Sequence, residues 1–109
     1  MGLITSSYRM MYLTAYQFTL ENKIQWISTA KMELMTSSDE ILGLGNDLDP
    51  ENPAVKQLEA RRQRLAVLEK RLDIQLKEYQ NRLQAVQTEL KSCEDAVSKA
   101  IESSFSYKI

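Results

Sequence analysis

The sequence contains no histidine and a single cysteine, and these shortages exclude most catalytic and metal sites. Without an imidazole there is no histidine base, no Ser-His-Asp or Cys-His arrangement and no histidine metal ligand. One cysteine forms neither a thiolate zinc cluster nor an intrachain disulfide. Gly43 and Gly45 occur in LGLGND, which lacks the Gly-Lys-Ser/Thr of a phosphate-binding loop. We therefore expect a protein that is not an enzyme and that uses no metal or cofactor.

Glycine and proline are also scarce, with three and two copies among 109 residues, too few to punctuate the many turns of an all-β fold. Hydrophobic residues make up 43% and charged residues 27%, close to the average of soluble domains. The longest run without a charge, residues 10–20, is much shorter than the ~20 apolar residues of a membrane-spanning helix. We expect one all-α domain with no membrane span.

One segment, residues 43–53 (GLGNDLDPENP), interrupts the chain. Gly and Asn end helices, and Pro50 disfavours helix at the residue before it. Asn52 suits the N-cap of a following helix, and Pro53 suits its first position, where no N–H is needed. The sequence predicts a helix over about 5–42, a turn over 43–53, a helix over about 53–104 and an apolar tail over 105–109. The expected fold is a two-helix antiparallel hairpin with a long, coiled-coil-like second helix.

The second segment has the clearest periodicity in the sequence. From residue 72 onward its apolar residues alternate between spacings of four and three, the pattern of a coiled-coil seam. Between residues 65 and 76 the spacings are three, four and four, which resembles a stutter. Cys93 lies within this seam, so we expect it to be a small core residue. The predicted seam consists of Leu65, Leu68, Leu72, Leu76, Tyr79, Leu83, Val86, Leu90, Cys93 and Val97.

The first segment is apolar on more than one face. A stripe with a spacing of mostly four or three residues predicts the face that packs on the second helix. Its members are Tyr8, Tyr12, Tyr16, Leu20, Ile24, Ile27 and Leu34. Further large apolar residues fall outside this stripe, namely Met10, Met11, Leu13, Phe18 and Trp26. Since one partner helix cannot cover all of these faces, we expect another chain to cover the second one.

Self-association is expected for two further reasons. The second helix outlasts the first, so the residues after Val97 have no partner helix within the chain, and several of them are large and apolar. A two-helix hairpin also has a small core and is marginally stable alone. The residues expected to mediate assembly are Tyr8, Met11, Tyr12, Tyr16, Ile101, Phe105 and Ile109. Basic and acidic residues are interleaved and the net charge is −1, so we expect no nucleic-acid partner.

The turn contains Pro50-Glu51-Asn52-Pro53, and Gln57 and Leu58 follow soon after it. The second helix ends in EDAVSKAIESSF, in which Ile101 and Phe105 are the aliphatic and aromatic residues of the match. At these three places the chain resembles the needle subunits of bacterial type III secretion systems. The segment LTAYQFTLENKIQWISTAKMELMTSS is similar to the N-terminal helices of flagellar rod and hook proteins. The needle resemblance implies helical hairpins that stack around a narrow channel through their C-terminal residues. Both resemblances imply export and polymerisation.

Two functions follow as expectations. The first is an exported structural subunit of a needle- or rod-like filament, with itself, secretion-apparatus components or an export chaperone as partners. Because the first residues lack the basic region and apolar core of a cleavable signal, we expect this subunit to reach the cell surface by signal-less export. The second is a cytoplasmic coiled-coil adaptor or export chaperone that forms a discrete dimer or tetramer through the Leu65–Val97 seam.

Overall fold

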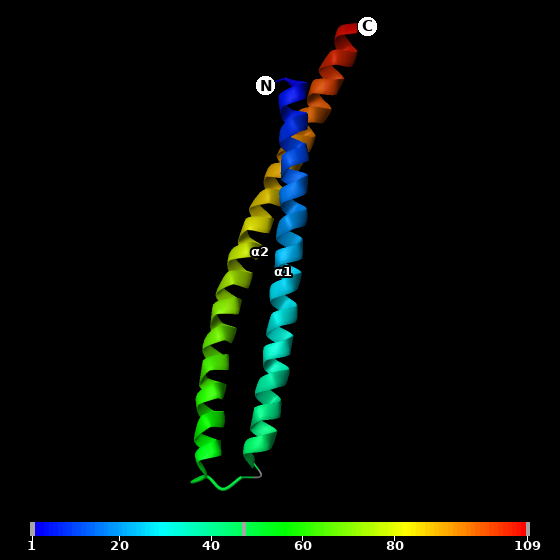
Figure 1. Ribbon diagram of the computed structural model, residues 1–109. Coiled ribbons are helices and arrows are strands. Elements are labelled where there is room, and N and C mark those ends of the chain that lie inside the picture. Colours follow the sequence, from blue (N-terminus) through cyan, green and yellow to red (C-terminus); the bar gives the residue numbers. More distant parts are fainter. Residues whose placement is uncertain (1, 47, 109) are drawn as a thin grey trace. The chain divides into compact units, whose positions relative to one another are not determined.

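The computed structural model describes residues 2–46 and 48–108, which form two long helices (Figure 1). Helix α1 covers Leu3–Asn46 and helix α2 covers Pro53–Lys108. The helices pack against each other as an antiparallel hairpin, so the predicted all-α hairpin is confirmed. They form two compact units: a terminal unit of residues 2–23 and 79–108, and a turn unit of residues 24–46 and 48–78.

The terminal unit contains the best-packed part of the hairpin. Leu13 and Leu20 of α1 are buried against Val86 of α2. The side chains that pack around this cluster are Tyr16, Tyr79, Leu83, Leu90 and Cys93. At its edge the Lys23 ammonium lies 5.3 Å from the centre of the Tyr79 ring, a cation–π contact between the helices. Apolar burial and cross-helix contacts together hold this unit.

The turn unit has fewer buried side chains. Ile27 and Ile41 of α1 are its buried apolar residues, and Leu72 and Leu76 of α2 are half-buried. An ion pair between Lys31 and Asp73 joins the two helices. Among the described residues the turn unit thus buries two apolar side chains, whereas the terminal unit buries three.

The start of α2 is organised by hydrogen bonds from side chains to the backbone. The Ala54 N–H donates to Asn52 Oδ1 at 3.0 Å, which satisfies one of the free N–H groups of the first turn. Pro53 occupies the first helical position. In the preceding turn, which contains Pro50, the Glu51 N–H donates to Asp49 Oδ1 at 3.2 Å. These local bonds fix the point at which the chain re-enters a helix.

Both helices extend beyond their expected ends. Helix α1 continues through Gly43 and Gly45 to Asn46, and neither glycine adopts a positive φ. Glycine costs a helix only about 1 kcal/mol relative to alanine, so two glycines do not end one without a left-handed cap. Helix α2 includes residues 105–108 of the expected separate tail, since no proline or glycine interrupts them. Ile109 lies outside the described residues.

The expected stutter in α2 is wrong. Leu68 is 45% exposed, whereas Glu69 is half-buried at the position facing α1. With Glu69 in place of Leu68, the α1-facing residues alternate between spacings of four and three from 65 to 97. The helix therefore keeps one heptad frame, and the Glu69 side chain has a flexible stem that can lie along the seam with its carboxylate toward water.

The predicted stripe on α1 is wrong at its start. Tyr8 and Tyr12 are 68% and 62% exposed, while Met10 is half-buried and Leu13 is buried. A strict four-residue spacing turns around the helix by about 40° per step, so it leaves a straight interface within a few residues. The α1-facing residues instead alternate between spacings of three and four, and Leu20 belongs to both patterns.

Candidate assembly surface

The outer face of α1 in the terminal unit carries a second heptad pattern. Its members, which we call the outer stripe, are Ile4, Tyr8, Met11, Ala15 and Phe18, and all of them are exposed. Met11 and Phe18 lie two positions before the buried residues Leu13 and Leu20. Two positions correspond to a rotation of about 200°, so the outer stripe faces almost directly away from α2.

The outer stripe is free of charge. Arg9 is the only charged residue of α1 before Glu21, and it forms an ion pair with Glu89 of α2. The Arg9 Nε–H donates to Glu89 Oε1 at 2.9 Å. This hydrogen bond and the negative charge of Glu89 raise the pKa of the Arg9 guanidinium above its ordinary value. Arg9, which follows Tyr8 of the stripe, is thus engaged by the other helix.

Hydroxyl groups beside the stripe are also occupied. Thr14 Oγ1 donates to the Met10 carbonyl at 2.8 Å, and Thr19 Oγ1 donates to the Ala15 carbonyl at 3.1 Å. Threonine hydroxyls bonded one turn back to the backbone compete less for water. The surroundings of the outer stripe are therefore less polar than the residue types suggest.

Tyr12 and Tyr16 connect this surface to the core. Their rings stack with centroids 6.2 Å apart and an angle of 3° between the planes. Tyr16 packs against the Leu13–Leu20–Val86 cluster, whereas Tyr12 is exposed beside the outer stripe. Of the expected assembly residues on α1, the structure thus exposes Tyr8, Met11 and Tyr12 and places Tyr16 partly in the core.

The apolar area on this side of α1 approaches the size of a protein interface. The side chains of Ile4, Tyr8, Met11, Tyr12 and Phe18 are each exposed by more than half. Together they offer roughly 650 Å², against about 800 Å² per partner in a standard interface. A patch of this size is at or above the upper end of what monomeric proteins expose.

A second apolar surface lies where α2 extends past the start of α1 (Figure 1). Val97 and Ala100 are half-buried, and every residue from 101 to 106 is exposed. Two large apolar residues of this overhang, Ile101 and Phe105, are 47% and 70% exposed. The expected assembly residue Ile109 lies outside the described residues.

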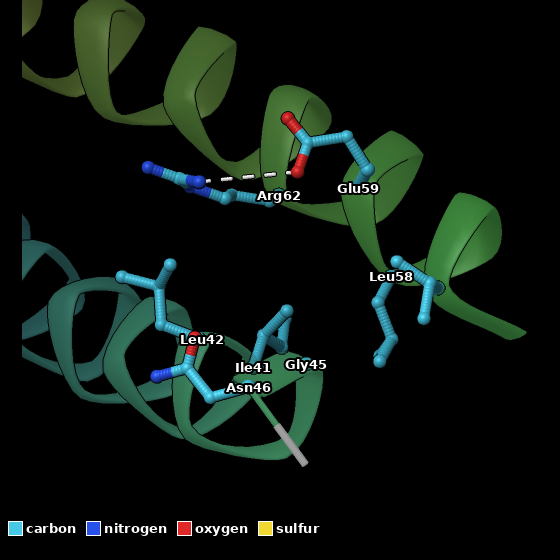
Figure 2. A pocket seen from close by; sticks show the side chains of 8 residues that line it. Ile41, Leu42, Gly45, Asn46, Leu58, Glu59 and Arg62 are labelled. Carbon is cyan, nitrogen blue, oxygen red and sulfur yellow. Dashed lines mark ion pairs between the residues drawn. The ribbon is translucent and has the colours of Figure 1, made fainter. Parts of the chain in front are cut away.

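A pocket between the helices of the turn unit is too small for a typical ligand site (Figure 2). Its volume is about 180 Å³, below the roughly 300–1,000 Å³ of small-molecule sites. Gly45 of α1 has no side chain to fill it, and Arg62 of α2 pairs with Glu59 at 3.8 Å. The pocket therefore follows from a missing side chain between the helices, since nothing outside its own stretch of helix lies within 4 Å of the position that a Cβ of residue 45 would take.

Two residues of the assembly surface, Ile4 and Phe18, are not among the expected assembly residues. Phe18 belongs to the second apolar face that another chain is expected to cover, whereas Ile4 belongs to neither expected face. Both residues belong to the heptad series that contains Tyr8 and Met11. A second heptad series on the same helix is the sequence signal that marks them.

Within residues 2–46 and 48–108, no group of three or more His, Cys, Asp or Glu residues is placed to hold a metal ion. Neither helix, over its described residues, is long and apolar enough to cross a membrane. No protein-family model, curated protein or solved structure matches this chain.

Proposed function

We propose that this chain is a structural subunit that self-associates into a needle- or rod-like filament. The observation that carries the proposal is the uncharged outer stripe of α1, which faces away from α2 and leaves a large apolar area exposed. Burying such an area against another subunit is favourable by roughly 25 cal/mol per Å² before the costs of association. In the isolated hairpin this apolar area stays exposed to water, so the favourable free energy of burying it is not gained.

A subunit that polymerises needs more than one contact surface. A surface that pairs only with itself gives a closed dimer, whereas two separate contact surfaces allow open growth. The outer stripe and the α2 overhang with Ile101 and Phe105 provide two apolar surfaces. The resemblance to type III needle subunits and to flagellar rod proteins supports a filament of an export apparatus and delivery outside the cell.

The alternative is a coiled-coil adaptor or export chaperone that dimerises through the α2 seam. In the terminal unit that seam is already packed on α1, with Val86 buried against Leu13 and Leu20. In the turn unit the seam residues Leu65, Leu72 and Leu76 are half-buried. A partner could use this seam only by opening the hairpin, so the fold favours assembly through outer surfaces.

The proposal is tested by negative-stain microscopy of the purified protein over a range of concentrations. We expect wild-type protein to form fibres of uniform width and indefinite length. Phe105→Ala should weaken growth, because hot-spot truncation typically costs 2 kcal/mol or more, equivalent to a critical concentration raised about 30-fold.

Gln80→Ala, at an exposed polar position of α2, is the matched control and should form fibres as the wild type does. Because Phe105 is exposed, its truncation should leave the helical content of the subunit intact. Fibres of Phe105→Ala at the wild-type concentration would refute the role of the overhang. A single dimer or tetramer at every concentration would refute the filament and favour the adaptor.

A further inference from the structure

We infer that the outer stripe binds the outer stripe of a second copy, with the two α1 helices antiparallel. In the register that we propose, Met11 lies opposite Ala15 of the second copy, and Tyr8 lies opposite its Phe18. This inference rests on the proposed self-association and specifies the contact that the α1 surface makes.

The chemistry of the stripe selects a second copy as its occupant. Because the stripe has no charge, it offers nothing that would recognise a charged partner. Its heptad spacing matches another helix with the same spacing, since seams pair when their repeats agree. Elsewhere in the terminal unit, the outward face of α2 carries charged residues such as Lys91, Glu94 and Asp95. The stripe itself matches the stripe in polarity and in heptad period, whereas this outward face of α2 does not.

The order of large and small residues along the stripe favours the antiparallel arrangement. In a parallel pair, like residues meet, so Ala15 would lie against Ala15 and leave a gap beside the Phe18 pair. In the antiparallel register, Ala15 faces Met11 of the second copy, and Tyr8 faces its Phe18. Facing large side chains with small ones fills an interface evenly, which is what close packing requires.

The ends of the helices support the same orientation. The first turn of α1 contains no acidic residue to offset the positive end of the helix dipole. A parallel pair would place two such ends side by side, whereas an antiparallel pair separates them.

Disulfide cross-linking tests this register. In a Cys93→Ser background, which removes the native thiol, Met11→Cys and Ala15→Cys are prepared as separate proteins. The two are oxidised singly and as an equal mixture, at a concentration where light scattering shows that the wild type associates. We expect the mixture to give at least fivefold more covalent dimer than either protein alone. Gln80→Cys, at an exposed position of α2, gives the level of random collisions.

The possible results separate this inference from the proposed function. Strong cross-linking of each variant with itself, without a gain in the mixture, would show a parallel pair and overturn the antiparallel register. Cross-linking at the Gln80→Cys level in proteins that still associate would exclude the stripe as the contact but leave self-association standing. Variants and wild type that stay monomeric at every concentration would overturn both proposals.

Discussion

Leu20 and Phe18 provide a direct test of which face of α1 packs within the chain. Leu20 is 1% exposed in the core of the terminal unit, whereas Phe18 is 65% exposed on the outer stripe. Truncating a buried leucine to alanine costs about 3–5 kcal/mol through lost transfer free energy and the cavity left behind. Truncating a largely exposed side chain costs well under about 1 kcal/mol.

The expected loss is large for this fold. Among the described residues only five apolar side chains are buried: Leu13, Leu20, Ile27, Ile41 and Val86. Small domains have unfolding free energies of roughly 5–15 kcal/mol, and a core this small places the hairpin at the low end. Leu20→Ala should therefore remove a third or more of the stability of the folded chain.

Urea unfolding followed by far-ultraviolet circular dichroism measures the difference, with the protein diluted until light scattering shows monomers. With a slope of about 2 kcal/mol per molar urea, Leu20→Ala should lower the unfolding midpoint by about 1.5–2.5 M. Phe18→Ala should leave the midpoint within about 0.5 M and should instead weaken association. Equal midpoints for the two variants, or a larger loss for Phe18→Ala, would refute the assignment of the two faces.

Two further predictions concern α2. Glu69→Leu places an apolar side chain at a half-buried seam position, so it should raise the free energy of unfolding in urea by roughly 1 kcal/mol. Leu68→Gln, at the exposed neighbouring position, is the control and should change it little. A destabilised Glu69→Leu variant would contradict the continuous heptad frame. Asn52→Ala removes the acceptor of the Ala54 N–H, so it should lower the free energy of unfolding by about 1 kcal/mol and lower the thermal midpoint. Glu51→Ala is the control. An unchanged midpoint for Asn52→Ala would show that the cap contributes nothing to stability.

The features that the sequence predicted are those encoded locally. The start of α2 depends on Asn52 and Pro53, whose preferences act within one helical turn. The heptad of α2 from Leu72 onward is a property of one helix, and polar residues between its apolar positions make the seam visible. These signals do not depend on the partner helix, so they are visible in the sequence alone.

The face of α1 could not be read in the same way, because apolar residues surround that helix. Tyr8 and Leu13 are both large and apolar, and only packing against α2 separates an exposed tyrosine from a buried leucine. In the same way, Leu68 is the more apolar neighbour of Glu69, but the heptad frame of the whole helix gives the facing position to Glu69. Tertiary packing, which couples distant residues, decides such positions over local hydrophobicity.

The most direct test of self-assembly is the mass of the wild-type protein measured by static light scattering as its concentration rises. The subunit mass is 12.6 kDa. We expect the mass to rise steadily with concentration and without a plateau, because each added subunit presents free apolar surfaces to the next. A mass that stays at 12.6 kDa at every concentration would contradict self-association through the outer stripe, and a plateau at a small multiple would contradict the filament.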